Sequence, residues 1–507
     1  MRGKVILIGA GPGNAGLMTL RGKQALESAE VVLYDRLVGD EILAMIPETA
    51  QIIDVGKSSG RHPIAQNEIN VLLHEYAKKG KIVVRLKGGD PYLFGRGAEE
   101  LEAIINENIP FEVVPGVTSA IAVPAFAGIP VSHRDFASSV HIITAHRQNG
   151  EAPDMDYQSI VRFGGTLVFL MGIGTIETVT SGLINAGMPA STPAALIENG
   201  TRPNQRKIIL TLDKISEKAK TEKFIPPSIL LVGDVCSLSD KLDWYSSLPL
   251  YGVKIIVTRP GDRNTLSSKL RELGADVIDF PCIKTKPLTL PDSLFENLTT
   301  YDWITFTSPV GADIFFDELK KRKIDIRMLC GVKIAAVGNK TALVFENRGI
   351  NIDYIPDNYN ARELGAGLPC NNSVLLFRAK DATPELPAAL TARGFTVNDV
   401  PVYETIRESV TSEKIKKDLE CGRIDFVTFT SASTVQGFSA ATADLTFDRS
   451  RFIAVCIGEE TATEARKHSY QVVISKQSTI ESMIEEIIED SKEQQIINSI
   501  PELERVK

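Results

Sequence analysis

The stretch VILIGAGPGN, residues 5–14, joins an apolar run to a crowded turn, and it sets the fold of everything that follows. Val5–Ile8 predicts a buried β-strand, and a helical pattern begins near Leu17. Between them the turn contains three glycines, Gly9, Gly11 and Gly13. A strand, a glycine-rich turn and a helix in this order are typical of an α/β sheet that holds a ligand at the carboxyl ends of its strands.

This turn comes close to the dinucleotide-binding fingerprint without completing it. The fingerprint requires glycine three positions after Gly11, where this chain has Asn14. Pro12 has no N–H group with which to bind a pyrophosphate. Asp35, at the end of the next apolar run, occupies the place of a ribose-binding acid. A NAD-dependent oxidoreductase is therefore one hypothesis, against which the broken glycine pattern counts.

Composition sets broad limits on the class of protein. A chain of 507 residues is too long to fold around one hydrophobic core, so we expect more than one domain. Of its residues 43% are hydrophobic, and the net charge is -8. No apolar run is long enough to span a bilayer, so we expect a cytoplasmic protein. The negative charge disfavours non-specific nucleic-acid binding. The cysteines show no metal-ligand spacing, so we expect buried free thiols and no metal site; they are Cys236, Cys282, Cys330, Cys370, Cys421 and Cys456.

Two further glycine- and proline-containing turns follow strands in the first half. VVRLKGGDPYLFGRGAEE (83–100) places bare backbone and the Asp90 carboxylate after an apolar strand, and VVPGVTSA (113–120) opens a helix. A plain Asp-Pro turn would also explain the first of these. Because carboxyl ends of parallel strands meet at one sheet edge, we expect residues 9–13, 88–91 and 115–119 to form the rim of one cleft.

The second half repeats itself after about 120 residues. WITFTSPVGADIF (303–315) returns as FVTFTSASTVQGF (426–438), and IAAVGNKTA (334–342) returns as AVCIGEETA (454–462). Each copy alternates apolar strands with helical patterns, which indicates two similar α/β lobes. The stretch LDWYSSLPLYG (242–252) before the first copy predicts a linker. Past Ser478 the acidic stretch STIESMIEEIIEDSKEQQ predicts a solvated helix.

The first half resembles the tetrapyrrole methylases, and within them uroporphyrinogen-III C-methyltransferase. The resemblance lies in GAGPG, LYD, VGK, RLKGGDPYLFGRGAEE, VPGVTSA, AGIPVSHR, LVFLMG and ENGTRPNQR, in family order. It implies that the first turn helps to bind S-adenosylmethionine instead of NAD. The contacts that it implies for this cofactor are Pro12, Gly88, Gly89, Asp90, Leu93, Thr118, Ser119, Met171 and Gly200. The chain departs from the family at Asn14-Ala15-Gly16 and at Ala145.

The resemblance also implies a catalytic pair, Asp35 as proton acceptor and Lys57 as proton donor. A carboxylate at a strand end suits the removal of a proton after methyl transfer, although a helix cap or a solvated lysine would explain these residues as well. The substrate that the resemblance implies, uroporphyrinogen III, carries eight carboxylates, and its binding site needs cationic side chains. By residue type the candidates are Arg61, Arg96, Arg134 and Arg147, each of which a plain surface position also explains.

The second half resembles uroporphyrinogen-III synthase, through VTRP, TFTSPVGADIF, AVGNKTA, VPVYET, TFTSAS and CIGEETATEA in order. It implies two α/β lobes that exchange strands, substrate contacts at Thr307, Ser431 and Thr461, and Tyr403 as a proton donor to the departing hydroxyl. The serines and threonines at strand ends would equally serve as helix N-caps, and Tyr403 as a core aromatic residue.

Together these resemblances predict an α/β protein: a two-domain tetrapyrrole-methylase fold followed by a bilobed α/β synthase with an internal repeat. The expected parts are residues 1–112 and 113–241 for the methylase subdomains, 242–251 for the linker, 252–490 for the synthase and 491–507 for a polar tail. The expected function is ring closure of hydroxymethylbilane and double methylation of the product. The alternative is a methyltransferase whose second half binds tetrapyrrole without catalysis. The resemblance also implies a homodimer through the methylase half.

Overall fold

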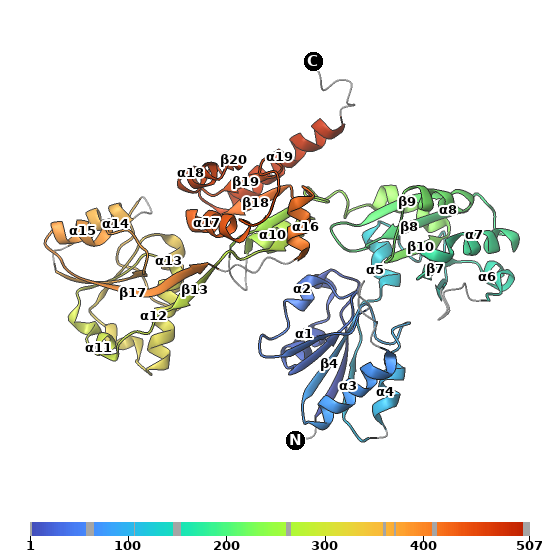
Figure 1. Ribbon diagram of the computed structural model, residues 1–507, viewed down its shortest axis with the longest axis horizontal. Coiled ribbons are helices and arrows are strands. Elements are labelled where there is room, and N and C mark those ends of the chain that lie inside the picture. The colour runs from blue at the N-terminus through green and yellow to red at the C-terminus, as the bar shows by residue number, and fades with distance from the viewer. Residues whose placement is uncertain are drawn as a thin grey trace, which may run out of the picture. The chain divides into compact units, whose positions relative to one another are not determined.

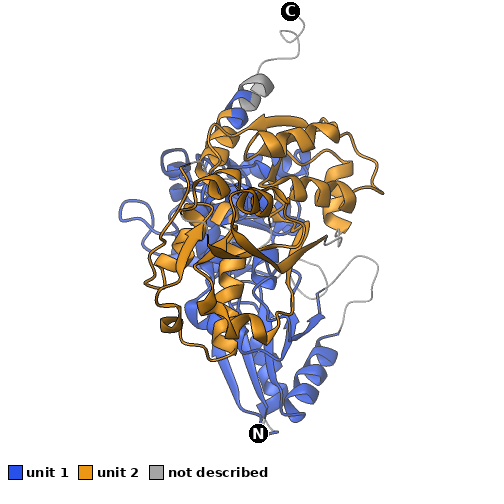
Figure 2. Cartoon of the chain, turned by 90° about the vertical axis from the view of Figure 1, so that its left-hand side faces the viewer, with its two compact units in different colours: residues 1–254, 268–277, 490–507 blue, residues 255–267, 278–489 orange. Residues whose placement is uncertain are grey.

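The computed structural model describes residues 3–56, 65–105, 107–145, 154–259, 265–357, 361–369, 372–407 and 413–499, the last helix with side chains to Glu493. The chain divides into two compact units (Figure 2). The first unit contains residues 1–254, 268–277 and 490–507, and the second contains 255–267 and 278–489.

The first sheet, of which β4 is labelled in Figure 1, is fully parallel, in the order β3-β2-β4-β1-β5. Its strands are β1 (Lys4–Gly9), β2 (Val31–Tyr34), β3 (Gln51–Asp54), β4 (Ile82–Lys87) and β5 (Phe111–Val114). Its helices are α1 (Leu20–Glu27), α2 (Asp40–Leu43), α3 (Gln66–Lys78) and α4 (Gly97–Ile105). Alternate residues of each buried strand face opposite layers, so Ile6 and Val84 pack with α1 and α2 while Leu7 and Val83 pack with α3 and α4.

The second sheet is mixed, in the order β6-β7-β10-β8-β9. Its strands are β6 (Val140–Thr144), β7 (Thr166–Leu170), β8 (Pro193–Glu198), β9 (Arg206–Thr211) and β10 (Ser228–Val232). Strand β10 runs antiparallel to both β7 and β8, and β8 and β9 form a hairpin. Helix α5 (Ser119–Phe126) packs on one face. The other helices here are α6 (Tyr157–Phe163), α7 (Ile176–Asn185), α8 (Leu212–Thr221) and α9 (Ser239–Leu242).

The predicted linker packs against the first unit. The Trp244 indole N–H donates to the Ala125 carbonyl at 3.0 Å, and the Lys207 ammonium donates to the Asp243 carboxylate at 2.8 Å. Tyr245 is buried beside Phe126, with ring centroids 4.8 Å apart. Residues 242–251 therefore extend the core of the first unit.

The second half forms two five-stranded sheets, each from both copies of the repeat. One has the order β12-β11-β18-β19-β20 and the other β13-β17-β16-β14-β15, in which only β13 is antiparallel to its neighbour among the pairings described. The strands are β11 (Lys254–Val257), β12 (Asp276–Asp279), β13 (Ile283–Pro287), β14 (Trp303–Phe306), β15 (Lys333–Ala336), β16 (Ser373–Ala379), β17 (Thr396–Arg407), β18 (Phe426–Phe429), β19 (Ile453–Cys456) and β20 (Gln471–Ile474).

Strand exchange separates the lobes from the sequence repeats. The first copy gives β11 and β12 to one sheet and β14 and β15 to the other, while the second copy gives β18 and β19 to the first sheet and β16 and β17 to the second. The helices are α10 (Thr265–Glu272), α11 (Asp292–Glu296), α12 (Pro309–Lys321), α13 (Asn339–Glu346), α14 (Ala361–Gly367), α15 (Glu385–Ala392), α16 (Glu413–Glu420), α17 (Ala432–Ala441), α18 (Glu459–Lys467) and α19 (Ile480–Ser499).

Helix α19 differs from the expectation of a solvated helix. It is helical as predicted, but it buries an apolar stripe of Ile480, Met483, Ile484 and Ile487. These residues stand at i, i+3, i+4 and i+7 and therefore share one helix face, whereas the acidic residues that suggested solvation lie mainly on the others. The helix also continues to Ser499, beyond the predicted start of a polar tail at residue 491.

Candidate functional site

The three glycine-rich turns of the first half, predicted to form the rim of one cleft, contact one another through their backbones. Gly11 and Gly89 exchange two backbone hydrogen bonds, at 3.2 Å from Gly11 N and 2.7 Å from Gly89 N. A Cβ on Gly116 would lie 2.2 Å from the Gly89 carbonyl oxygen and 2.6 Å from the Gly9 Cα. Only glycine permits this backbone contact. The turns thus form one main-chain cluster at the carboxyl ends of β1, β4 and β5.

Asp90 joins two of these turns through its side chain. One carboxylate oxygen accepts the N–H groups of Tyr92 and Leu93 at 2.9 and 3.0 Å, and the other accepts Gly116 N–H at 3.1 Å. The Asp90 carboxylate therefore has the turn-forming role that an Asp-Pro sequence suggests. Gly89 has φ +70°, and nothing lies within 4 Å of the position of a Cβ there, so its backbone is open to a ligand.

The other expected cofactor contacts lie at strand and helix ends. Thr118 is the N-cap of α5, with its hydroxyl accepting from Ala120 N–H at 3.3 Å, and Ser119 is the first residue of the helix. Gly200, after β8, packs against Val123 of α5. Met171, after β7, is half exposed with φ 58°, a conformation that non-glycine residues seldom adopt. The remaining two, Pro12 and Gly88, belong to the first two turns.

Asp35 follows β2 and is held by a buried cation. Its side chain is 31% exposed, and one oxygen accepts the Arg85 guanidinium at 2.5 Å. Arg85 lies on β4, next to β2 in the sheet, and its side chain is only 2% exposed. It also donates to the Leu33 and Leu86 carbonyl oxygens and to Glu100. Asp35 is therefore oriented by an arginine that is itself fixed on three further sides.

Glu100 and Lys87 complete a buried network that sequence reasoning missed. The Glu100 side chain, with no exposed surface, accepts the Lys87 ammonium at 2.7 Å and Arg85 Nε at 3.2 Å through Oε1. The Lys87 ammonium lies 4.0 Å from the other Asp35 oxygen. Burial lowers the pKa of Lys87, as does the neighbouring Arg85, while Glu100 and Asp35 oppose this. The available signal was Arg85 and Lys87 within an otherwise apolar strand, where charged residues are rare.

The remaining predictions for the first half have different outcomes. Lys57, Arg61 and Arg147 lie outside the described residues. Arg96 pairs with Glu99 at 2.5 Å and has φ 60°, and Arg134 is exposed.

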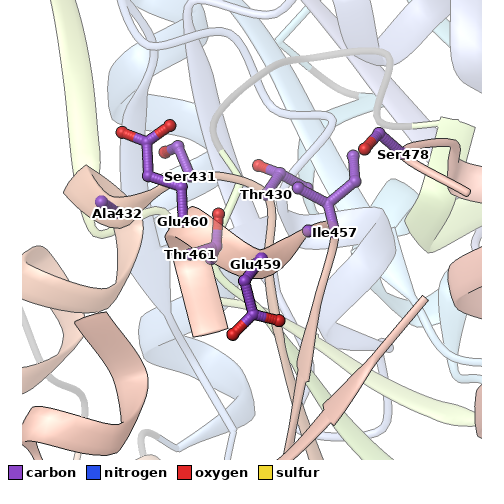
Figure 3. A pocket seen from close by; sticks show the side chains of 9 residues that line it. Thr430, Ser431, Ala432, Ile457, Glu459, Glu460, Thr461 and Ser478 are labelled. Atoms are coloured by element: carbon purple, nitrogen blue, oxygen red, sulfur yellow. The ribbon is translucent and has the colours of Figure 1, made fainter. Parts of the chain in front are cut away.

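In the second half, two strand-to-helix turns line a pocket of about 320 Å³ (Figure 3). Ser431 is the N-cap of α17, and Gly458 is the N-cap of α18. Of the expected substrate contacts, Ser431 and Thr461 lie here. The lining residues are Thr430, Ser431, Ala432, Ile457, Gly458, Glu459, Glu460, Thr461 and Ser478. Hydroxyl groups and two helix N-termini at one pocket suit the binding of an anionic group, whereas the Glu459 and Glu460 carboxylates in the same lining oppose it.

Tyr403 and Thr307 lie in the other lobe. Tyr403 is half buried on β17, and its hydroxyl donates to the Ser308 hydroxyl at 3.0 Å. Ser308, adjacent to Thr307, caps α12 by accepting Gly311 N–H at 3.1 Å. Ser308 and Ser431 thus both cap helices, which is the alternative explanation given above for the hydroxyl residues at strand ends. The Tyr403 hydroxyl is thus held at the strand-to-helix turn before α12, which is the same type of turn as the one before α17 that lines the pocket.

The described residues lack both a metal-type cluster of side chains and a membrane-spanning helix. They contain no group of three or more histidine, cysteine, aspartate or glutamate side chains suited to a metal ion. Within the same ranges, no helix combines the length and apolar character needed to cross a membrane.

Comparison with known proteins follows the division of the chain. The family model of the tetrapyrrole (corrin/porphyrin) methylases matches residues 4–216, and that of uroporphyrinogen-III synthase HemD matches residues 264–485. A porphyrin biosynthesis protein HemD from Ruminiclostridium josui is 45% identical over 96% of this chain and 98% of its own. The chain belongs to this family. It is a bifunctional enzyme of tetrapyrrole biosynthesis, with uroporphyrinogen-III C-methyltransferase and uroporphyrinogen-III synthase domains.

Two further relatives are methyltransferases, and the match to the first of them extends beyond the methyltransferase half of this chain. A uroporphyrinogen-III C-methyltransferase from Bacillus subtilis is 40% identical over 72% of this chain and 76% of its own. The crystal structure of uroporphyrin-III C-methyltransferase from Thermus thermophilus with S-adenosyl homocysteine is 36% identical, covering 46% of this chain and 99% of its own at a TM-score of 0.41. The turn at residues 9–13 lies within residues 4–216, which match the tetrapyrrole methylase model, so the family match favours a methylase over a NAD-dependent oxidoreductase.

Proposed function

We propose that the synthase domain closes hydroxymethylbilane to uroporphyrinogen III with inversion of ring D. We further propose that the methyltransferase domain methylates this product at C2 and C7 with S-adenosylmethionine to give precorrin-2. The observation that carries the second proposal is the Asp35 carboxylate, held by Arg85 at the carboxyl end of the sheet on which the three turns meet.

The described residues fit S-adenosylmethionine at the cluster of turns. Gly89 offers open backbone, and the N-terminal N–H groups of α5 stand beside Thr118 and Ser119. When bound, S-adenosylmethionine supplies an already activated methyl group. The contacts proposed for it are Pro12, Gly88, Gly89, Asp90, Leu93, Thr118, Ser119, Met171 and Gly200. Positioning of the pyrrole β-carbon, which is nucleophilic, then supplies most of the rate.

Asp35 is proposed as the base that accepts the proton lost when the methylated pyrrole regains its conjugation. Arg85 supports this role because its guanidinium, 2.5 Å from one Asp35 oxygen, holds the carboxylate in a fixed position, with the Lys87 ammonium 4.0 Å from the other oxygen. Lys57 is proposed as the proton donor by resemblance alone.

For ring closure, the main task is to hold the linear substrate in one productive fold while loss of its hydroxyl generates a reactive azafulvene. Thr307, Ser431 and Thr461 are proposed contacts, and Tyr403 is proposed to donate a proton to the departing hydroxyl. The support is that Ser431 and Thr461 line one pocket and that the Tyr403 hydroxyl is half buried and already donating. To act on substrate, the Tyr403 O–H must turn from Ser308 to the leaving oxygen.

One assay tests both domains. Enzymatically generated hydroxymethylbilane is supplied with and without S-adenosylmethionine, and the products are followed by isomer analysis and absorbance. We expect the type III isomer, and its methylated product only with the cofactor. Type I isomer alone would reduce the second half to a non-catalytic binding module, and unmethylated type III isomer would refute the methyltransferase proposal.

A matched pair of variants sharpens this assay. Asp35→Asn should depress methylation at least 100-fold and leave ring closure intact. Asp54→Asn is the control, because Asp54 ends the neighbouring strand β3, is exposed, and within the described part of the chain accepts a hydrogen bond from the nearby Gly56 N–H alone. Equal loss of both activities in Asp35→Asn would contradict two independent sites.

We also propose a cytoplasmic homodimer that associates through the methyltransferase domain. The proposed dimer rests on the resemblance of this half of the chain to the tetrapyrrole methylases. Light scattering of the purified chain should give twice the monomer mass, and a monomer at micromolar concentration would refute the dimer. Fractionation of cells that express the chain tests the compartment.

A further inference from the structure

Arg202 stands where two parts of the methyltransferase domain meet. It lies in the turn that joins β8 to β9, two strands of the second sheet that are labelled in Figure 1. Its Nη2 nevertheless donates to the Leu37 carbonyl oxygen of the first subdomain at 2.9 Å. Leu37 is two residues beyond Asp35. The Arg202 side chain also covers Gly13, since a Cβ there would lie 2.6 Å from Nε and 3.0 Å from Cγ.

The backbone that presents Arg202 is unusually constrained. Asn199 and Thr201 both have positive φ, 51° and 69°, and for a β-branched threonine this is a rare conformation. Gln205 holds the turn in place, accepting Thr201 N–H at 2.8 Å and donating to the Phe126 carbonyl at 3.1 Å. A turn that keeps such strain and aims one cation at the Asp35 loop is typical of a functional site.

The guanidinium of Arg202 is incompletely partnered. It makes no ion pair within 4.0 Å inside the described ranges, and there its only hydrogen bond as a donor is the one to Leu37. Burial lowers its pKa, and the charge of Asp40 opposes this. Arg206, four residues on, shows the contrast, because it pairs with both oxygens of Glu198 and lies over the Phe224 ring at 4.5 Å.

A partly buried guanidinium with free N–H groups is suited to a planar anion, above all a carboxylate. This one touches both the Gly13 turn, where the cofactor is proposed to bind, and the loop that carries the proposed base. Both ligands of the proposed reaction carry carboxylates, one on S-adenosylmethionine and eight on uroporphyrinogen III. We propose that Arg202 binds a ligand carboxylate at this junction; the inference rests on the proposed methyltransferase function.

The test uses the full-length chain and three variants. Arg202→Met removes the charge, Arg202→Lys keeps the charge without the planar fork, and Arg206→Met controls for damage to the same hairpin. The measurements are calorimetric Kd values for S-adenosyl homocysteine and for 5′-methylthioadenosine, which lacks the amino-acid carboxylate, and the KM for uroporphyrinogen III. A charge-assisted hydrogen bond to a ligand corresponds to about 10- to 100-fold in affinity.

Two results support the proposal and identify the source of the carboxylate. If Arg202→Met weakens S-adenosyl homocysteine at least tenfold and leaves 5′-methylthioadenosine unchanged, the carboxylate is that of the cofactor. If instead the KM for uroporphyrinogen III rises at least tenfold at unchanged Kd for S-adenosyl homocysteine, the carboxylate belongs to the tetrapyrrole. In either case Arg202→Lys should retain part of the affinity, and Arg206→Met should not reproduce the pattern.

Other results overturn it. Kd and KM values within twofold of the wild type, or equal weakening of both nucleoside ligands, would reduce Arg202 to a structural contact with Leu37 and refute this inference alone. A wild-type chain that binds no S-adenosyl homocysteine and methylates nothing would refute the proposed function together with this inference.

Discussion

Replacement of Glu100 by glutamine tests the buried network beneath Asp35. The change keeps the shape of the side chain but removes the carboxylate that faces both Arg85 and Lys87. The three side chains are between 0% and 4% exposed, so water cannot replace the lost partner. Removal of one partner from a buried ion pair costs about 3–5 kcal/mol. Because Asp35 still pairs with Arg85, we expect the lower value, about 3 kcal/mol, or roughly two orders of magnitude in the unfolding equilibrium.

The pH dependence of this loss follows from Lys87. The pKa of Lys87 is lowered in the folded chain from its ordinary value of 10.5, which it keeps in the unfolded chain. At pH values between the folded and the unfolded pKa, the unfolded chain binds more protons than the folded chain, so the free energy of unfolding rises with pH. The Glu100 charge raises the pKa of Lys87, so its removal extends this window to lower pH. We therefore expect the deficit of Glu100→Gln against the wild type to be smaller at pH 9.5 than at pH 7.

The stability of the first unit is measured by pulse proteolysis of the full chain in urea. Mass spectrometry quantifies the peptides from residues 83–105, which report on this unit. Glu99→Gln is the control, since Glu99 is 54% exposed on the same helix and its pair with Arg96 is worth at most about 1 kcal/mol. Equal stability of the two variants at pH 7, or a deficit that grows toward pH 9.5, would refute the reasoning.

Three further predictions concern other parts of the chain. Gly116→Ala should cost about 1–3 kcal/mol and weaken S-adenosyl homocysteine binding in calorimetry, whereas Gly174→Ala, with nothing within 4 Å of its Cβ, should do neither; equal effects would contradict the packing of the turns. Tyr403→Phe should slow type III isomer formation at least tenfold in the hydroxymethylbilane assay, and an unchanged rate would leave Tyr403 as a core residue. Burial raises the pKa of the Cys236 and Cys456 thiols to about 12 and that of the Cys282 thiol further. After brief iodoacetamide treatment at pH 8, peptide mapping should therefore find these three cysteines unmodified and the exposed Cys330 and Cys421 alkylated. Fast alkylation of one of the three buried thiols would contradict its burial.

Local residue chemistry was enough to predict the turns and the direction of the chain through them. Glycine and proline at residues 9–13 and 88–91 restrict the backbone whatever surrounds it, and the apolar runs before them form strands as expected. The helix start at Thr118 and Ser119 was likewise predictable, because a threonine hydroxyl satisfies an N–H group at the helix end. Even the buried face of α19 was present in its spacing, where acidic composition was wrongly given more weight.

Contacts between distant segments were decided only by the tertiary structure. Asp35 meets Arg85 because β2 and β4 are neighbours in the sheet, and Arg202 reaches Leu37 across 165 residues. The strand exchange of the second half was expected from the resemblance to uroporphyrinogen-III synthase, but the repeat itself did not predict it, since similar copies of a motif contain no information on which sheet each strand enters. Spacing fixes local conformation through φ, ψ and nearby hydrogen bonds, whereas strand order depends on the burial of the whole chain, and a single local pattern is compatible with many such arrangements.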